Sequence, residues 1–268
     1  ESDHRGHRAT GGRRVKRVLV TVVAAGLFLS GCSAPTAPAS PDSFTGTVTV
    51  FAAASLTDTF GAIADAFERE HPNVTVALNF GGSSSLATQI IGGAPADVFA
   101  AASGATMATV ADAGLTVGEP TVFVTNTLEI AVPAGNPGGI TGLADFANAD
   151  LGLALCAVEV PCGAASKSVF DGAGIVAAPD TLELDVRAVL TRVELGEVDA
   201  GLVYRTDVIA AGDRVEGIEF PEASTAIGAY PIALLSASTN RVSASAFIAW
   251  VLSPAGKEIL TDAGFGAP

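Results

Sequence analysis

The sequence predicts an α/β fold in which parallel-rich sheets are flanked by helices. The first observation is that β-rich runs alternate with helix-periodic segments along most of the chain. Strand–helix–strand units place their strands parallel in one sheet and their helices on its faces, so this alternation favours parallel sheets. The second observation is composition. Hydrophobic residues make up 49% of the 268 residues, enough for one large domain or two small ones with their own cores, and too many for a disordered chain.

The individual elements follow from local patterns, taken in chain order. A β-rich run at Thr47–Ala53 precedes a helix at Leu56–Glu70, whose apolar residues recur at helical spacing until Pro72 ends it. Further strands are predicted at Val74–Phe80, Asp97–Ala100, Leu128–Val132, Gly152–Leu155, Ala200–Tyr204 and Tyr230–Leu235. Further helices are predicted at Ser84–Ile91, Met107–Ala113, Ala164–Ala173, Leu184–Leu195 and Ser243–Leu252.

Residues 1–32 are predicted to be an export signal and not part of the fold. They carry a basic run followed by an apolar stretch, Val18–Leu29, which is too short to span a bilayer comfortably. The stretch ends in Leu29-Ser30-Gly31-Cys32, which resembles a bacterial lipobox, where the signal is cut before the cysteine and the cysteine is lipidated. Acyl chains on Cys32 would anchor the protein to the outer face of the cell membrane. The alternative is an ordinary apolar segment with a chance cysteine.

The charge of the chain divides sharply at the end of this signal. Residues 1–32 hold six of the 14 basic residues and two of the 28 acidic ones, so the remainder has 8 basic and 26 acidic residues, a formal charge of −18. Such an acidic body argues against a nucleic-acid binder, which needs a basic face for phosphates. Residues 33–44 are rich in Pro, Ala and Ser and are predicted to be an extended tether.

Two cysteines remain in the folded part, Cys156 and Cys162. Their spacing is typical of neither a zinc site nor a thioredoxin-like motif. Because an exported protein meets an oxidising compartment, a small-loop disulfide is favoured. Two free buried thiols are the alternative.

The chemistry-bearing residues argue against an enzyme. Beyond the signal the chain has a single histidine, His71, which Pro72 follows at a helix end. Neither a Gly-x-Ser-x-Gly elbow, a phosphate-binding loop nor a dinucleotide-binding glycine pattern is present, and the acids are scattered. We therefore expect no catalytic residues, no cofactor and no metal site built from His, Cys and carboxylates.

The remaining signal is a set of four helix starts, each following a strand end and a tight turn. Helix N-termini present unpaired N–H groups and a partial positive charge, so they bind anions without Lys or Arg. In open α/β sheets, ligands bind beyond the carboxyl ends of the strands, where such turns lie. Each serine cluster alone is more often a plain N-cap, and the combination carries more weight. The four segments are Ala52–Asp58, Phe80–Leu86, Val160–Ala164 and Leu184–Arg187.

These segments and two others resemble the periplasmic molybdate-binding proteins of ABC importers, in order from about residue 47 to the C-terminus. The motifs that carry the resemblance are Thr49–Leu56, the serine run Ser83–Ser85, Gly92–Phe99, Val160–Gly163, Asp185–Arg187 and Gly201–Asp207. The resemblance implies a two-lobed periplasmic-binding-protein fold (type II) with two hinge crossovers. Lobe 1 would comprise residues 45–125 and 217–268, and lobe 2 would comprise residues 126–216.

The resemblance also implies a set of neutral donors for a tetrahedral oxyanion. The two serines are Ser55 and Ser83, although the serine run permits a one-residue slip to Ser84. Backbone N–H groups would come from Cys162 and Val186, and a phenol from Tyr204; as a strand-end residue, Tyr204 could equally belong to the core. Molybdenum is then present only within bound molybdate.

The function implied is capture of molybdate, and of tungstate, for delivery to ABC transporter permease subunits by a monomeric protein. The nearest alternative is a protein for sulfate, thiosulfate or another tetrahedral oxyanion. An octahedral oxometalate site with Glu159 and Asp185 as carboxylate ligands is a second alternative. A serine hydrolase using Ser55 or Ser83 is a third, which the missing histidine disfavours.

Overall fold

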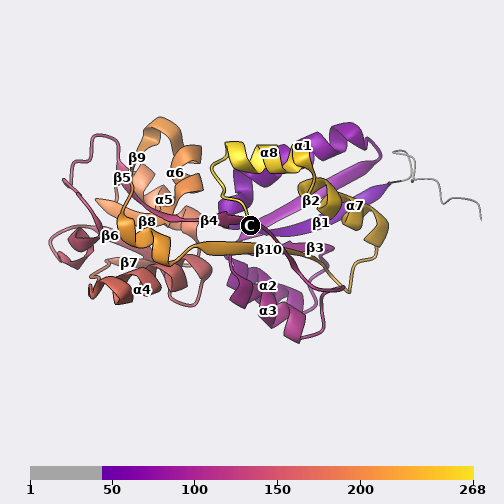
Figure 1. Ribbon diagram of the computed structural model, residues 1–268, viewed down its shortest axis with the longest axis horizontal. Coiled ribbons are helices and arrows are strands. Elements are labelled where there is room, and N and C mark those ends of the chain that lie inside the picture. The colour runs from indigo at the N-terminus through magenta and orange to yellow at the C-terminus, as the bar shows by residue number, and fades with distance from the viewer. Residues whose placement is uncertain (1–43) are drawn as a thin grey trace, which may run out of the picture. The chain divides into compact units, whose positions relative to one another are not determined.

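Residues 44–268, which the computed structural model describes, form two five-stranded sheets with helices packed against them (Figure 1). The strand order is β2-β1-β3-β10-β4 in the first sheet and β7-β6-β8-β5-β9 in the second. The predicted signal with Cys32, and the predicted tether up to residue 43, lie outside the described residues.

The first sheet is mixed, with parallel strands on one side and antiparallel strands on the other. β1 pairs in parallel with β2 and β3, and β10 pairs antiparallel with β3 and β4. The late strand β10 therefore returns to the sheet that the N-terminal part of the chain began. The bounds are β1 (Gly46–Ala53), β2 (Val74–Gly81), β3 (Val98–Ala100), β4 (Thr121–Asn126) and β10 (Gly228–Leu234).

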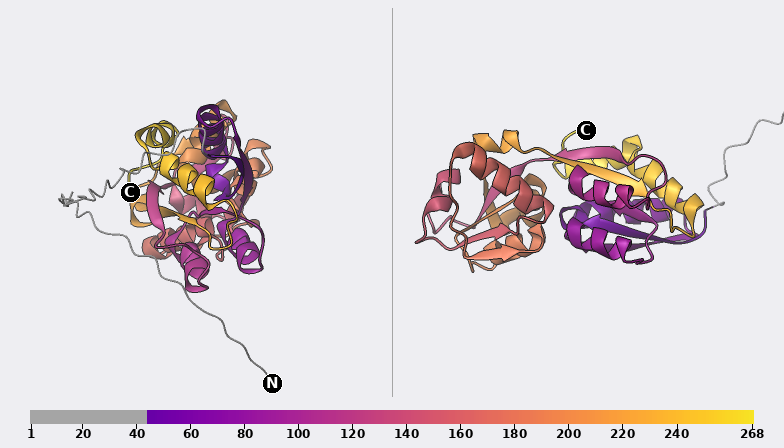
Figure 2. Two further views of the ribbon diagram at one scale, coloured as in Figure 1. Left: turned by 90° about the vertical axis from the view of Figure 1, so that its right-hand side faces the viewer. Right: turned by 90° about the horizontal axis from the view of Figure 1, so that it is seen from below.

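Alternation along the strands gives the first sheet two buried faces. Val50 and Ala52 belong to one apolar cluster, whereas Phe51 and Phe99 belong to another, because successive side chains of a strand point to opposite faces. Helices α1 (Thr57–Glu70), α7 (Arg241–Val251) and α8 (Pro254–Asp262) supply the first cluster. Helices α2 (Ser83–Ile91) and α3 (Gly104–Asp112) supply the second, and Figure 2 shows the helices on both sides of the sheet.

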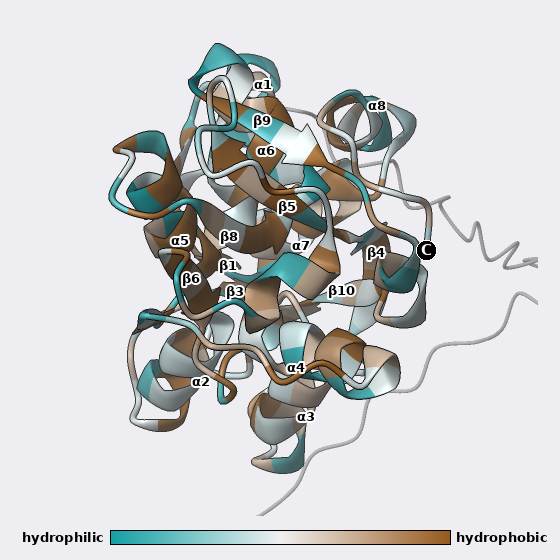
Figure 3. Ribbon diagram, turned by 90° about the vertical axis from the view of Figure 1, so that its left-hand side faces the viewer, coloured by the Kyte–Doolittle hydropathy of each residue, from teal (hydrophilic) through white to brown (hydrophobic). Residues whose placement is uncertain are grey.

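The second sheet is mixed in the same way and encloses one apolar cluster. β6 pairs in parallel with β7 and β8, and β5 pairs antiparallel with β8 and β9. Hydrophobic residues of β5 and β8 belong to this cluster, and these strands lie between the helices in Figure 3. The bounds are β5 (Leu128–Pro133), β6 (Leu153–Cys156), β7 (Thr181–Glu183), β8 (Ala200–Tyr204), β9 (Val215–Ile218), α4 (Pro161–Ala173), α5 (Val186–Glu194) and α6 (Arg205–Ala211). Four short 3-10 helices are η2 (Ala54–Leu56), η3 (Leu143–Ala147), η4 (Gly212–Arg214) and η5 (Pro221–Thr225).

The predicted fold class is confirmed, with two refinements. All six further strands and five further helices expected from the sequence are present within a few residues, but β4, β7, β9, α6 and α8 were not anticipated. Strict β-α-β reasoning also missed the antiparallel ladders made by β5 and β10. The chain passes from the first sheet to the second at Thr127 and returns through residues 219–227. The second sheet ends at Ile218, and the lobe bounds expected from the sequence stay a prediction.

The structure forms the disulfide favoured from the sequence, Cys156–Cys162, with an S–S distance of 2.08 Å. It joins the end of β6 to the first turn of α4. Between residues 44 and 268, none of the helices has the length and apolarity required to cross a membrane.

Candidate functional site

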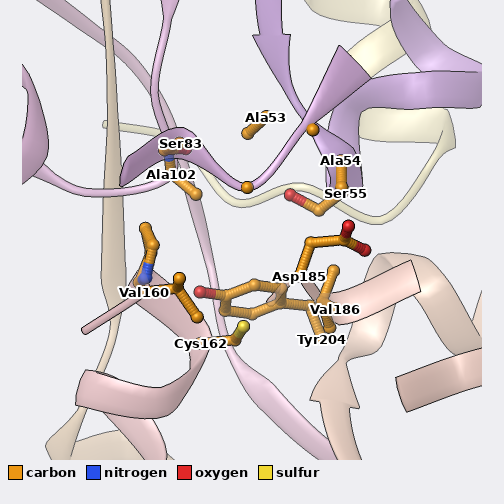
Figure 4. A pocket seen from close by; sticks show the side chains of 13 residues that line it. Ala53, Ala54, Ser55, Ser83, Ala102, Val160, Cys162, Asp185, Val186 and Tyr204 are labelled. Carbon is orange, nitrogen blue, oxygen red and sulfur yellow. The ribbon is translucent and has the colours of Figure 1, made fainter. Parts of the chain in front are cut away.

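A small cavity lies where the four predicted helix starts come together (Figure 4). About 20 Å³ is open to the centre of a water molecule, where a single water needs about 10–15 Å³. The cavity therefore suits a small ion, whereas drug-sized ligands need several hundred Å³. Its walls are formed by Ala53, Ala54, Ser55, Gly81, Gly82, Ser83, Ala102, Val160, Pro161, Cys162, Asp185, Val186 and Tyr204.

Ser55 reaches the cavity from η2, the short helix between β1 and α1. The β1 strand is buried over its last residues, which brings the chain to the edge of the first sheet before it turns. The Ser55 side chain is only 7% exposed, and its hydroxyl lies 2.9 Å from the hydroxyl of Tyr230 on β10. A buried partner therefore fixes the rotamer of this serine.

Ser83 and Ser84 have different surroundings, although they are adjacent at the start of α2. Ser83 lines the cavity, is 1% exposed, and its Oγ accepts the N–H of Ala102 at 3.0 Å. Ser84 is not among the lining residues, and its hydroxyl donates to the carbonyl of Glu159 at 2.7 Å. Of the two serines that the sequence left as alternatives, Ser83 is the one placed at the cavity.

Cys162 lies in the first turn of α4, just after Pro161 at the first helical position. Proline lacks an N–H, so the first free N–H groups of this helix begin at Cys162. Gly163 follows in very close contact with the preceding loop, since a Cβ at this position would meet the carbonyl oxygen of Ala157 at 1.8 Å. The disulfide and this close contact both hold the turn that presents the Cys162 N–H.

Val186 is the first residue of α5, and the preceding Asp185 is its N-cap. The Asp185 carboxylate accepts the N–H of Ala188 at 3.0 Å, which leaves the Val186 N–H without a partner inside the helix. Asp185 lines the cavity but its carboxylate is occupied in capping, and Glu159 is not among the lining residues. Within residues 44–268, no cluster of three or more His, Cys, Asp or Glu side chains is arranged to hold a metal ion.

Tyr204 ends β8, and its ring lies across the cavity (Figure 4). Burial, together with the charge of Asp207, raises the pKa of Tyr204 above its usual value, so its phenol stays protonated and can donate. Asp207 accepts the Tyr204 N–H at 3.1 Å, and burial raises the pKa of Asp207 to about 7 against the opposing effect of Arg187. Arg187 lies 3.7 Å from Asp207 and 3.0 Å from Asp58 of α1.

The positive potential of the cavity comes from helix dipoles, because the charged side chain on its lining, Asp185, is acidic and caps α5. Among the described residues, no lysine, arginine or histidine lines it. The N-termini of α2, α4 and α5 meet there, and each contributes roughly half a positive charge and unpaired N–H groups. Two serine hydroxyls and a phenol add further donors. The arrangement can hold a small anion by hydrogen bonds from several directions.

The position of His71 bears on the hydrolase alternative. His71 follows the last residue of α1 and packs against Phe44 and Phe67, with ring centroids 5.1 and 4.5 Å away. Ser55 lies two residues before the first residue of the same helix, at its other end. The 14 residues of α1 correspond to a length of about 21 Å, which keeps this imidazole far from either serine.

The sequence profile of the bacterial extracellular solute-binding proteins matches residues 48–266. The chain belongs to this family. It is 42% identical over 248 residues to the molybdate-binding protein ModA of Mycobacterium tuberculosis H37Rv, and the match covers 92% of this chain and 95% of that protein. The family resemblance drawn from the sequence motifs is thereby confirmed.

Two solved structures extend the comparison of this solute-binding protein. A substrate-binding domain of a putative molybdenum ABC transporter from Clostridium difficile is 27% identical, with a TM-score of 0.62 over 83% of this chain and 99% of that one. The sulfate-binding protein SubI of Mycobacterium tuberculosis is 19% identical, with a TM-score of 0.71 over 82% of this chain and 86% of that one. The second likeness shows the fold alone, so the fold by itself does not decide between oxyanions.

For this solute-binding protein, the sequence predicted the residues that line the cavity better than the residues that hold them in position. All five principal predicted residues, Ser55, Ser83, Cys162, Val186 and Tyr204, line the cavity. Tyr230 and Asn126 were missed, and Gly82, which lies in the predicted helix start Phe80–Leu86, has a packing role that was not anticipated. A Cβ on Gly82 would meet the carbonyl oxygen of Leu184 at 2.3 Å, so only glycine fits between α2 and the loop before α5. Rarity was the available signal for Tyr230, since the chain has only two tyrosines.

Proposed function

We propose that this protein captures molybdate, and also tungstate, outside the cytoplasm and delivers it to the permease subunits of an ABC importer. The observation that carries the proposal is the small cavity ringed by three helix N-termini, two serines and a tyrosine, with no cationic side chain from residues 44–268 on its lining. The printed names of the Mycobacterium tuberculosis and Clostridium difficile proteins support molybdate and an ABC transporter as ligand and partner.

The donor set favours a fully ionised oxyanion. Ser55, Ser83 and Tyr204 would donate from side chains, and Cys162 and Val186 from the backbone. Hydrogen bonds to a charged group contribute about 1.5–3 kcal/mol each, so five of them reach the roughly 8 kcal/mol of micromolar binding. A protonated oxyanion would present its own O–H to a ring of donors, and the acidic side chain on the lining, Asp185, already accepts the Ala188 N–H, so that proton is poorly accommodated. Hydrogen phosphate is therefore disfavoured relative to molybdate.

Sulfate is the strongest competing ligand, because it has the same charge and shape. Only the size of the cavity separates the two anions, and size alone is a weak discriminator. Isothermal titration of the purified protein with molybdate, tungstate and sulfate tests the proposal. We expect molybdate and tungstate to bind at least tenfold more tightly than sulfate. Sulfate binding within tenfold of molybdate would contradict the assignment.

The same site supports a binding protein and not an enzyme. The proposed hydrogen bonds hold the anion without a nucleophile–base pair, because His71 is remote from both serines. The function needs no cofactor, and a single chain contains every proposed contact, which fits a monomer. Lack of labelling of Ser55 and Ser83 by a serine-reactive phosphonate is the expected result, and labelling of either one would revive the hydrolase alternative.

We also propose that the protein is tethered to the outer face of the cell membrane through acyl chains on Cys32. The support is the sequence Leu29-Ser30-Gly31-Cys32 after a basic run and an apolar stretch. Mass spectrometry of the N-terminal peptide from the membrane fraction should find a lipid-modified Cys32. The Cys32→Ala variant should lack this modification and should no longer be held in the membrane fraction. An unmodified Cys32 in that peptide would contradict the tether.

A further inference from the structure

The hydrogen bonds around Tyr230 control what the Ser55 hydroxyl can do. Tyr230 is fully buried on β10, and its hydroxyl is hydrogen-bonded to two residues at the edge of the first sheet and also interacts with the Tyr204 phenol. One is Ser55 Oγ at 2.9 Å, and the other is the side-chain amide nitrogen of Asn126 at 3.4 Å. Either oxygen could donate in the bond between Tyr230 and Ser55. The orientation of Asn126 selects one of the two.

The Asn126 amide is held in one orientation at the end of β4. Its Oδ1 accepts the backbone N–H of Thr127 at 3.0 Å, and its Nδ2 donates to Thr206 Oγ1 at 2.8 Å. An amide rotated by 180° would set its NH₂ group against the Thr127 N–H, donor against donor. The NH₂ group therefore faces Tyr230, and the Tyr230 oxygen accepts from it.

The proton of Tyr230 then has Ser55 Oγ, 2.9 Å away, as its hydrogen-bond acceptor, in preference to the neighbouring Tyr204 phenol. Burial, together with the neighbouring Tyr204, raises the pKa of Tyr230 well above its usual value, so the phenol keeps its proton. If Tyr230 donates to Ser55 Oγ, the proton of Ser55 is left free to point into the cavity. We propose that Asn126 and Tyr230 are positioning residues that make Ser55 a dedicated hydrogen-bond donor toward the bound anion. This inference rests on the proposed oxyanion-binding function.

The Ser83 hydroxyl is also oriented as a donor toward the cavity, in this case by a backbone N–H group. Its Oγ accepts the N–H of Ala102 at 3.0 Å, which leaves the Ser83 proton for the cavity. Both serines thus have an acceptor lone pair occupied by the protein and a proton to give. A hydroxyl in this state is poorly placed to accept a proton from a ligand. The relay from Asn126 through Tyr230 to Ser55 therefore discriminates against protonated oxyanions.

A double-mutant cycle at positions 126 and 230 tests the relay. Asn126→Asp keeps the shape of the side chain but replaces the NH₂ donor with an acceptor for the Tyr230 proton. Tyr230 must then accept from Ser55, whose proton turns away from the cavity. We expect molybdate affinity to fall about 10- to 150-fold, the loss of one charge-assisted hydrogen bond or more. In the Tyr230→Phe background, Asn126→Asp acts through its charge alone, and the loss of molybdate affinity that it causes should be much smaller.

Three further measurements keep the result interpretable. Thr125→Asp places the same charge one residue away on half-buried β4, and Thr125→Val, which also removes the hydrogen bond from Thr125 to the Ala267 carbonyl, is its reference for the electrostatic effect. Tyr230→Phe alone frees Ser55 to accept, so it should raise phosphate binding relative to molybdate binding. Thermal unfolding of each unliganded variant reports folding; if Asn126→Asp does not fold, the ratio of phosphate to molybdate affinity in Tyr230→Phe decides.

The outcomes separate the relay from the proposed function. Titration of the wild-type protein with molybdate, tungstate and sulfate tests the proposed function independently of the relay. The double-mutant cycle is then run with whichever of these anions binds most tightly. The relay is overturned if Asn126→Asp lowers anion affinity by the same factor in the wild-type and Tyr230→Phe backgrounds. It is also overturned if Tyr230→Phe leaves the phosphate-to-molybdate ratio at its wild-type value.

Discussion

Ser83 and Ser84 show how one residue of register separates a ligand contact from a packing contact. Ser83 points into the cavity with its Oγ bound by the Ala102 N–H, and Ser84 donates away from it to Glu159. Ser83→Ala should weaken molybdate binding about 10- to 150-fold, because a charge-assisted hydrogen bond is lost. Ser84→Ala removes an ordinary hydrogen bond and should cost at most about tenfold. Calorimetric titration of both variants checks this, and a larger loss for Ser84→Ala would contradict the assignment.

At this scale the sequence predicted ligand contacts but not their partners. The family resemblance placed Ser55, Cys162, Val186 and Tyr204 at the cavity. Ser55, Cys162 and Tyr204 lie at or just after strands that local patterns predicted, whereas Val186 follows β7, which they did not. In the serine run Ser83–Ser85 the sequence could not tell which serine is the ligand contact, since three identical consecutive residues can be matched to the motif in more than one register. The Ser55–Tyr230 bond joins residues 175 apart. Sheet pairing brings them together, and no local pattern records that pairing.

The N-terminus of α4 is the element whose geometry is most constrained. Pro161 starts the helix, the disulfide ties Cys162 to the end of β6, and Gly163 lies against Ala157. These three features hold one turn in place, although only the Cys162 N–H is proposed to meet the ligand. The helix is therefore pre-organised before the ligand arrives, which lowers the entropy cost of binding.

Two glycine substitutions in α4 test this constraint against each other. A Cβ at Gly163 would lie 1.8 Å from the Ala157 oxygen, so Gly163→Ala must displace the turn. We expect a loss of about 1–3 kcal/mol in stability and at least roughly tenfold in molybdate affinity. Gly172→Ala, in the same helix, meets nothing within 4 Å and should stabilise by about 0.5–1 kcal/mol without altering affinity. Unfolding and titration of both variants decide, and unchanged affinity in Gly163→Ala would refute a constrained turn.

The elements missed from the sequence share a physical cause. β4 exposes Val122 and ends in polar residues, and α6 has only seven residues, so neither shows a clear period. The antiparallel pairing of β10 with β3 and β4 depends on a chain return of more than one hundred residues. Local patterns identified β10 as a strand, but its direction in the sheet is a property of the whole topology.

At the scale of the whole molecule, both sheets contribute to the same cavity. Ser55 and Ser83 follow strands of the first sheet, whereas Cys162, Val186 and Tyr204 follow strands of the second. Contacts between the two parts surround the cavity. Asp58 of α1 lies 3.0 Å from Arg187 of α5, and Ser84 of α2 donates to Glu159. An anion bound to both parts would add its own hydrogen bonds to these contacts and favour the closed arrangement.

The net charge of residues 33–268 affects the rate at which the anion associates. Residues 33–268 carry a formal charge of −18, and among the described residues no cationic side chain lines the cavity. A dianion is therefore repelled at long range and attracted only at short range by helix ends and hydroxyls. Salt screens the long-range part, with a Debye length near 30 Å at 0.01 M and about 8 Å at 0.15 M. The association rate should therefore rise as sodium chloride is added.

Stopped-flow measurement of molybdate binding to the folded body, from about 0.01 to 0.3 M sodium chloride, checks this expectation. The dissociation rate serves as an internal control, because the bound anion is buried and its short-range hydrogen bonds are screened much less. We expect the association rate to increase roughly severalfold and the dissociation rate to change little. Slower association at high ionic strength would mean that the local field at the cavity mouth already attracts the anion from a distance. The acidic surface would then have no kinetic effect on capture.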